Sequence, residues 1–294
     1  MKSFLKCLLI LVGIVLLSAI LAPVLHTFLP FKFGRIFNRL IMIFSLLSIA
    51  AFVRFTPQTF LKYGLAWRPE SPQFLMAGFT AGIVTLVLLG TLKFLAGVAV
   101  WNVESISWLG AVTQFVGIVA TAFLIGTLEE FFFRGFIYSF LKEHRWNTIL
   151  AVLMTSFFYS MVHFISEKKP FIGPDPTFMD SLKLAAAPFS SLLEWRSFWR
   201  GAVGLFLFGG ILNALVIWTR SLYLSIGLHA GCVFFVKSDG FFVDFLNDSP
   251  LLWGSAKMYD SAAGWVFLVL VGLALWFYAG TVVKPQKENL GRSI

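Results

Sequence analysis

Long apolar stretches, separated by short polar groups, make up most of the chain. A helix needs about 20 apolar residues to cross a bilayer, and stretches near that length recur along the sequence. We predict transmembrane helices over residues 4–29, 37–53, 74–100, 108–141, 146–165, 199–219, 221–237 and 263–283. The predicted fold class is therefore all-α, a polytopic membrane helix bundle of about eight transmembrane helices.

The fourth span, 108–141, is longer than one perpendicular crossing requires at about 1.5 Å per residue. We expect it to be tilted, kinked or continued by an interfacial helix. The connections between spans hold prolines, glycines and charges that would be costly in hydrocarbon. The longest are 166–198, which ends in an amphipathic stretch, and the acidic segment 238–262.

No internal repeat or separate soluble domain interrupts this pattern. We predict one integral-membrane domain over residues 1–294, ending in a short basic tail at 284–294. Lys2 and Lys6 precede an apolar run that resembles a signal peptide, but the run is long for one and continues past Pro23. We predict that it is retained as a signal-anchor helix.

The composition excludes most soluble classes. Hydrophobic residues form 59% of the chain and charged residues 13%, and the mean hydropathy of +0.86 is far above that of soluble domains. The formal net charge of +9 comes from Lys and Arg mostly in loops and at the termini. No basic tract is interleaved with aromatic residues, as single-strand binding requires. The expected partner is therefore the lipid bilayer and not nucleic acid, and Cys7 and Cys232, both in apolar segments, indicate no disulfide framework.

The distribution of basic residues predicts an orientation. Most of the Lys and Arg residues in the loops fall on one side if both termini are cytoplasmic. Lys32, Arg35 and Arg39 disagree with this orientation, as does the mixed-charge segment 166–198. We predict a multi-pass protein of a bacterial inner (plasma) membrane with both termini in the cytoplasm.

A few polar residues lie inside the predicted spans. Ionisable groups near the bilayer centre cost about 2.5–3.5 kcal/mol on insertion scales, so each is a candidate functional residue. These residues are Lys93, Glu129, Glu130, Arg134, His163, Asn213 and His229, with Lys237 at a span edge.

The stretch "GTLEEFFFRG" at 126–135 holds two of these carboxylates and an arginine on one helix. Glu130 and Arg134 have the i, i+4 spacing with the acid first, which favours an ion pair. Glu129 lies about 100° around the helix from Glu130, so Arg134 does not neutralise it. A carboxylate in an apolar pocket suits a general base acting on water. The alternative is that all three residues form a buried charge network that fixes helix packing.

The two intramembrane histidines, His163 and His229, lie on separate spans. A lone intramembrane His most often bonds a neighbouring helix, but two of them beside a diglutamate helix favour convergence on one cavity. Asn213 either points a donor into the same cavity or bonds a neighbouring helix, and we favour the second. Lys93 is expected to snorkel from a span end. Close helix packing is expected at four glycines: Gly126, Gly135, Gly227 and Gly231.

Three motifs in order resemble those of the CPBP family of intramembrane endopeptidases, also called Abi or CAAX-protease-and-bacteriocin-processing. They are Glu-Glu-x-x-x-Arg at 129–134, an aromatic-x-x-x-His motif at 159–163 and "SIGLHA" at 225–230. The resemblance covers roughly residues 105–240, which would form a CPBP-like catalytic core. The family includes the eukaryotic Ras-converting CAAX protease.

The resemblance implies hydrolysis of a peptide bond in a membrane protein or peptide substrate. By position, Glu129 would activate water with the assistance of His163. Glu130 and Arg134 would support the site, and His229 would help to stabilise the oxyanion. Amide hydrolysis needs a base, a proton donor and an electrophilic partner for the tetrahedral intermediate, which these roles supply.

Two positions depart from the family pattern. Tyr159 stands where the second motif usually has Phe, and it is expected to support the site. Val233 stands where the third motif usually has Asn or Asp. Asn213 or Lys237 are the candidates for a substitute oxyanion donor.

The resemblance leaves metal dependence open. If Zn²⁺ is bound, Glu129, His163 and His229 would hold it with a water in the remaining position. The chain has no His-Glu-x-x-His motif, and a glutamate-water mechanism explains the same residues without a cation. We favour that mechanism and commit to no cofactor, with Zn²⁺ kept as the alternative.

Two other functions compete with proteolysis. A proton-coupled membrane transporter would use the same carboxylates and histidines as a relay, but the chain shows no paired halves with matching interrupted helices. A catalytically inactive scaffold related to such proteases would be consistent with Val233.

Overall fold

Helices dominate the computed structural model, which describes residues 2–55, 64–101, 108–164, 170–191, 195–238, 243–246, 251–255 and 259–282. The predicted basic tail at 284–294 lies outside these residues. The chain divides into two compact units: Met1–Thr59 with Met161–Phe198, and Phe60–Ser160 with Trp199–Ile294. The predicted all-α membrane bundle is confirmed as a class, and the expectation of one domain stays a prediction.

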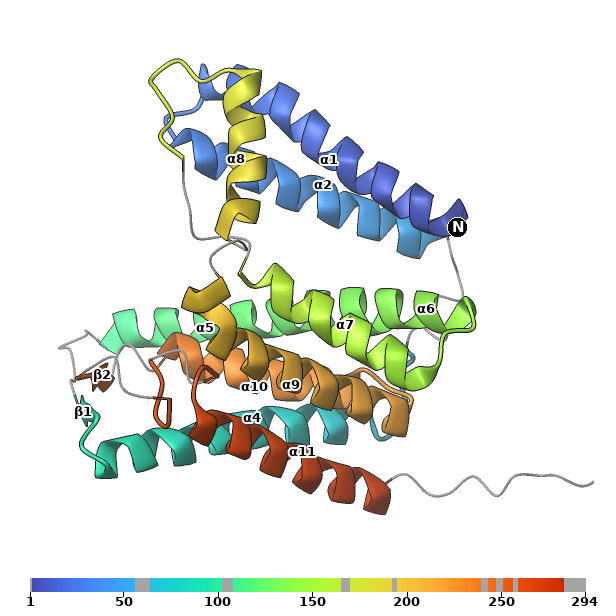
Figure 1. Ribbon diagram of the computed structural model, residues 1–294, viewed down its shortest axis with the longest axis vertical. Helices are drawn as coiled ribbons and strands as arrows, with labels where there is room; N and C mark the ends of the chain where they lie inside the picture. The colour runs from blue at the N-terminus through green and yellow to red at the C-terminus, as the bar shows by residue number, and fades with distance from the viewer. Residues whose placement is uncertain are drawn as a thin grey trace, which may run out of the picture. The chain divides into compact units, whose positions relative to one another are not determined.

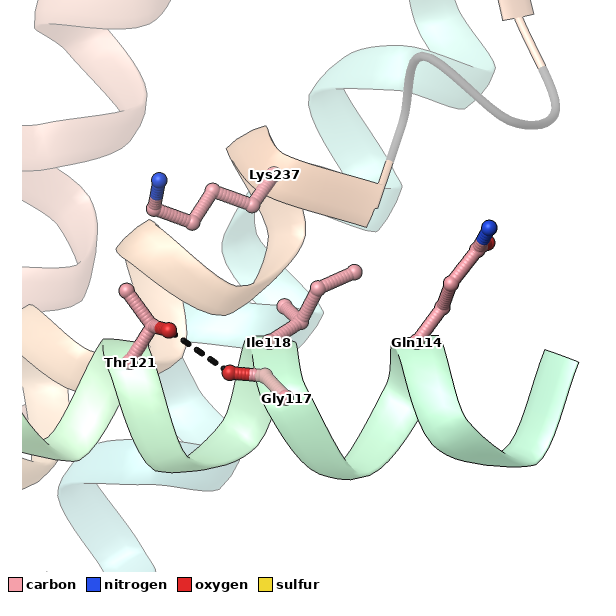
Figure 2. A pocket seen from close by; sticks show the side chains of 5 residues that line it. All are labelled: Gln114, Gly117, Ile118, Thr121 and Lys237. Carbon is pink, nitrogen blue, oxygen red and sulfur yellow. Dashed lines mark hydrogen bonds between the residues drawn. The ribbon is translucent and has the colours of Figure 1, made fainter. Parts of the chain in front are cut away.

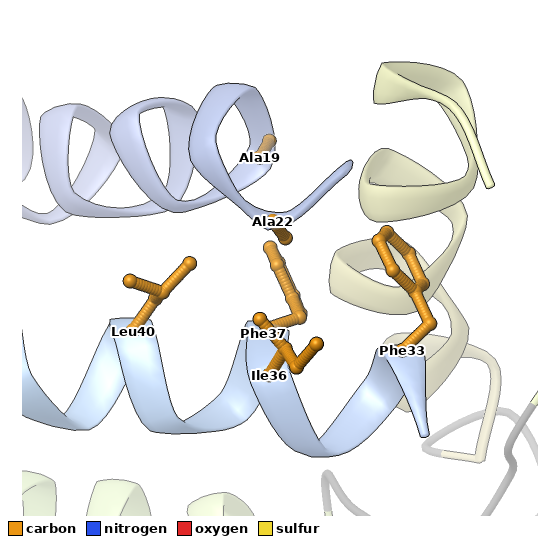
Figure 3. Close-up of a cluster of buried hydrophobic side chains, with 6 residues drawn as sticks. All are labelled: Ala19, Ala22, Phe33, Ile36, Phe37 and Leu40. Carbon is orange, nitrogen blue, oxygen red and sulfur yellow. The ribbon is translucent and has the colours of Figure 1, made fainter. Parts of the chain in front are cut away.

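The first unit is built around a helical hairpin. Helix α1 (Lys2–His26) packs against α2 (Phe33–Phe55), and α8 (Phe178–Ser191) crosses the pair (Figure 1). Small alanines on α1 leave room for the larger side chains of α2, so the two helices close over a common core (Figure 3). This core consists of Ala19, Ala22, Phe33, Ile36, Phe37 and Leu40.

Helix α8 occupies part of the connection that we predicted to contain an amphipathic stretch. Its start carries a reciprocal cap, because both the amide and the hydroxyl of Thr177 donate to Oδ2 of Asp180, at 2.9 and 2.8 Å. Ser181 then donates to the carbonyl of Ala19 at 3.1 Å, which ties α8 to α1.

The second unit contains the remaining elements, with α7 belonging to it as far as Ser160 and α9 from Trp199 onward. In chain order these elements are α4 (Ser71–Leu95), β1 (Ala99–Trp101), α5 (Trp108–Glu130), the π-helix η1 (Phe131–Tyr138), α6 (Ser139–Glu143), α7 (Thr148–Val162), α9 (Trp195–Thr219), α10 (Tyr223–Ser238), β2 (Val243–Phe245) and α11 (Ala262–Val282). Within this unit α10 packs against both α4 and α5 (Figure 1).

Five described helices are long and apolar enough to cross a membrane, and the protein is an integral membrane protein. They are Leu9–His26, Ser71–Leu95, Val112–Glu143, Phe198–Thr219 and Ala262–Val282. Helices α7 and α10 are apolar but shorter, with 15 and 16 residues. At about 1.5 Å per residue they reach roughly 22–24 Å, less than the hydrocarbon thickness of about 30 Å. The predicted count of eight is therefore not confirmed.

Glycines bring α4 and α10 into backbone contact, as predicted for Gly227 and Gly231. A Cβ atom on Gly227 would strike the carbonyl of Leu75, and one on Gly231 would strike the carbonyl of Phe79. On the facing helix α4, a Cβ on Gly82 would lie 2.7 Å from the carbonyl oxygen of Leu228 on α10. No larger residue fits at these positions without separating the helices.

Lys93 corrects one expectation about this unit. Its side chain does not reach water but is only 1% exposed, and its Nζ donates to the carbonyl of Ser255 at 2.9 Å. Asp260 holds Ser255 in place by accepting from its amide at 2.9 Å and from its hydroxyl at 2.6 Å. This part of the acidic segment 238–262 thus lies against the end of α4.

A short antiparallel sheet, which the all-α prediction omitted, lies beside this part of the segment. Strands β1 and β2 pair Val100 with Asp244. Each strand is only three residues long, too short for alternation of apolar and polar residues to reveal it.

Candidate active site

One long helix carries Glu129, Glu130 and Arg134, and the short helix α10 carries His229. Gly126 lets the two approach, because a Cβ there would lie only 3.2 Å from the carbonyl of Ile226. Immediately after Glu130 the helix changes to the π form over Phe131–Tyr138 and then returns to the α form. The expectation of a tilted, kinked or continued helix did not include this π segment, a feature that often accompanies functional sites.

Glu130 and Arg134 form the predicted ion pair, and both side chains are fully buried. Nη1 of Arg134 lies 2.8 Å from Oε1 of Glu130. Nη2 of Arg134 donates to the carbonyl of Gly209 at 3.2 Å. The guanidinium carbon also lies 4.5 Å from the ring centroid of Tyr159, within range of a cation–π interaction. A buried charge is tolerable only with such partners.

His229 is oriented by the same carboxylate. Its Nδ1 lies 3.0 Å from Oε1 of Glu130, so the Nδ1–H donates to that oxygen. The ring is 3% exposed, and the rings of Tyr159 and Phe208 meet it edge to face at 6.0 and 5.6 Å. Nε2 is then the ring atom left for chemistry, as an acceptor when the imidazole is neutral and as a donor when it is charged.

Glu129 lies on the other side of this imidazole. Its Oε2 is 3.8 Å from Nε2 of His229, and its side chain is 30% exposed, whereas that of Glu130 is fully buried. The separation is too long for a direct hydrogen bond. The two adjacent carboxylates therefore differ as predicted: one holds Arg134 and His229, and the other is accessible.

Residues 111–235 match a family model described as "Rce1-like: Type II CAAX prenyl endopeptidase Rce1-like". This segment is Rce1-like. It contains the Glu129, Glu130, Arg134 and His229 cluster and lies within the predicted core at 105–240. The predicted resemblance to the CPBP family is thereby confirmed, and it supports the predicted class, a membrane-embedded endopeptidase. Neither the curated proteins nor the solved structures gave a match to the chain.

His163 is the predicted catalytic residue that belongs to the other compact unit. It lies in the turn that follows α7, in the first unit, whereas Tyr159, one helical turn earlier in the Rce1-like segment, is 1% exposed in the second unit. The assistance of Glu129 by His163 stays a prediction.

Asn213 makes the interhelical bond that we favoured. It is 1% exposed, and its Nδ2 donates to the carbonyl of Gly209 at 2.9 Å and to the hydroxyl of Ser156 on α7 at 3.3 Å. Gly209 therefore accepts from both Asn213 and Arg134. The adjacent pair Gly209-Gly210 is the sequence feature that could have indicated the close approach of α9 to α7 at Ser156. No sequence pattern indicates that Ser156 or Phe208 belongs to the site.

The α10 positions beyond His229 lie farther from the cluster. Val233 is half-buried one turn on, and Lys237 is exposed two turns on. Lys237 lines a groove between α5 and α10 (Figure 2). The roles of Asn213 and Lys237 as oxyanion donors stay predictions.

The donors at this site do not fit a zinc ion as described. Among the residues that the structure covers, no group of three or more His, Cys, Asp or Glu side chains is arranged to hold a metal. Glu130 and Nδ1 of His229 bind each other, which leaves the carboxylate of Glu129 and Nε2 of His229. A catalytic zinc takes three protein ligands, so we derive no step of the Rce1-like chemistry through a metal.

Proposed function

We propose that this protein is a membrane-embedded endopeptidase that hydrolyses a peptide bond of a membrane-associated protein substrate with water activated by Glu129. The observation that carries the proposal is the array of Glu130, His229 and Glu129 within the Rce1-like segment. Glu130 binds one nitrogen of the imidazole, and the other nitrogen faces the accessible carboxylate at 3.8 Å.

In the proposed reaction a water molecule lies beside Glu129 and Nε2 of His229. Glu129 removes a proton as the water oxygen attacks the carbonyl carbon of the substrate. The charged imidazole of His229 donates Nε2–H to the oxyanion that forms. Glu129 then passes its proton to the leaving nitrogen as the C–N bond breaks, which yields a carboxyl group and an amine.

Glu130 and Arg134 position His229 in this scheme without contacting the substrate. The guanidinium pairs with the carboxylate of Glu130 in the buried interior, and that carboxylate holds the ring by accepting from its Nδ1–H. Tyr159 and Phe208 both pack edge to face against the ring and restrict its movement. The imidazole is thus fixed before the substrate arrives, which preorganises the site.

Glu129→Gln tests the proposal directly. With purified protein in proteoliposomes and a library of membrane-anchored reporter peptides, we expect this variant to lower kcat by about 10²–10⁴-fold, the contribution of a general base. Glu143→Gln, a change of an exposed carboxylate on α6, should retain activity. A Glu129→Gln protein that cleaves at the wild-type rate would overturn the assignment, and equal thermal unfolding of the two variants in detergent excludes misfolding.

A further inference from the structure

Another groove lies between α4 and α11, two of the helices that are long and apolar enough to cross the membrane. These helices pack against each other within the second unit (Figure 1). The groove has a volume of about 600 Å³ and is open to the surroundings of the protein. Its lining includes three small residues and three polar ones, namely Ala77, Ala81, Ala274, Gln73, Thr80 and Tyr278.

The lining residues of α4 follow the spacing of one helix face. Gln73, Ala77, Thr80 and Val84 are three or four positions apart along the chain, so they form a continuous stripe down the helix. Small side chains in such a stripe let a second backbone approach closely, and polar ones form hydrogen bonds across the contact. Both are the features of a face that binds another transmembrane helix.

The polar side chains of the groove are the second sign of such a helix. Elsewhere on α4, Thr85 and Thr91 donate to carbonyl oxygens four residues earlier, at 2.7 and 2.8 Å. The side chains of Gln73, Thr80 and Tyr278 form no hydrogen bond to any residue that the structure describes. A polar group without a partner is costly in hydrocarbon, and a lipid acyl chain has no donor or acceptor to offer. The occupant of the groove therefore carries hydrogen-bonding groups of its own.

The chemistry of this face is complementary to itself. Within the described part of the chain, no charged side chain lines the groove, so two copies would meet there without repulsion. Amide and hydroxyl side chains each hold both a donor and an acceptor. Two copies inserted in the same orientation are related by a two-fold axis along the membrane normal, which places residues of equal depth opposite each other. Gln73 and Thr80 would then each face their counterpart in the second copy and bond to it.

We propose that this groove is the interface of a homodimer, in which α4 of each copy lies in the groove between α4 and α11 of the other. The helix has the ridge that this packing needs, because Met76 and Val84 on the same face are 56% and 48% exposed. The four helices α4 and α11 of the two copies then form one bundle across the membrane. This inference goes beyond the proposed endopeptidase function and does not depend on the role of Glu129.

The test counts copies of the full chain in liposomes by single-molecule photobleaching, over a series of protein-to-lipid ratios. We expect two bleaching steps for the wild-type protein at high ratios and one step on dilution. Thr80→Val removes a hydrogen bond between transmembrane helices and should weaken the dimer by about 3- to 20-fold. Ala274→Phe fills the groove from an exposed position on α11 and should give monomers at every ratio.

Two control variants separate this effect from general damage. Thr91→Val makes the same change on α4 as Thr80→Val, but it removes an exposed hydroxyl that already donates within its own helix, so the dimer should persist. Ala120→Phe enlarges an exposed alanine on α5, outside the groove, and should also leave the dimer intact. Equal thermal unfolding of the four variants in one detergent shows that all of them fold.

Each other outcome contradicts the dimer at this face. A single bleaching step for the wild-type protein at every ratio overturns it, and a lipid that native mass spectrometry finds bound to such a monomer would assign the groove to that lipid. A dimer that both Thr80→Val and Ala274→Phe leave unchanged forms through another face. Equal weakening by Thr91→Val or Ala120→Phe would show that the groove is not the contact.

Discussion

At the scale of residues, the adjacent Glu129 and Glu130 differ in burial and in bonding partners. Glu130 is fully buried and bonded to both Arg134 and His229, whereas Glu129 is partly exposed. A rotation of about 100° between neighbouring helical positions is enough to separate them. Two identical side chains therefore have different surroundings, and the proposed function assigns the buried one to holding His229 and the exposed one to activating water.

The buried ion pair makes a prediction about stability. Arg134→Met leaves the Glu130 carboxylate without its cation in a dry interior, and we expect this to lower the free energy of unfolding by about 3–5 kcal/mol. Denaturant unfolding in detergent, followed by tryptophan fluorescence, measures the change. The double variant Glu130→Gln with Arg134→Met removes both charges and should be more stable than Arg134→Met alone. If Arg134→Met is more stable than the double variant, Arg134 is not needed to compensate the buried carboxylate of Glu130.

Residue spacing within one helix predicted this part of the site, but it did not predict the contacts between segments that are distant in sequence. The i, i+4 pair and the distinct role of Glu129 followed from helical geometry alone. The bond from His229 to Glu130 joins residues 99 apart in sequence, and no local pattern encodes which helices meet. The bonds that Arg134 and Asn213 donate to the carbonyl of Gly209 could not be predicted either, because every residue has a backbone carbonyl.

At the scale of elements, the packing of α10 determines where His229 points. Its glycines face α4, which leaves the histidine to face α5 and its carboxylates. The sequence predicted close packing at these glycines but not which helix they meet. The π segment was also not predicted, since its residues "FFFRGFIY" show no pattern that differs from an α-helix.

Gly231→Ala should disturb this packing. The new Cβ would strike the carbonyl of Phe79, so the helices must separate, and we expect a loss of about 1–3 kcal/mol in the free energy of unfolding. Gly117→Ala is the matched control, because a Cβ there meets nothing within 4 Å. Thermal unfolding of both variants in one detergent compares them. Equal stability of the two would show that α4 and α10 adjust without strain.

At the scale of the whole molecule, hydropathy predicted the membrane class and the approximate positions of the five described helices that are long enough to cross. It did not settle the number of crossings, because α7 and α10 are apolar but short. Hydropathy measures composition over a window, whereas crossing also depends on helix length and on what surrounds the helix.

The predicted orientation restricts that number. Five crossings would leave the two termini on opposite sides of the membrane. Two cytoplasmic termini need an even number of crossings, so an odd number of helices besides these five must also cross. We expect a reporter enzyme active only outside the cytoplasm to be silent when fused to either terminus, because basic residues favour the cytoplasmic side. Activity of the reporter at one terminus only would contradict the orientation and restore an odd count.

The shortness of α10 also bears on what surrounds His229. The helix that carries His229 spans about 24 Å, some 6 Å less than a typical hydrocarbon layer. Its residues from Leu224 to Gly231 are all buried, so protein and not lipid surrounds this part of the helix. A helix enclosed in this way does not have to match the thickness of the bilayer, and its histidine is shielded from hydrocarbon by the helices around it.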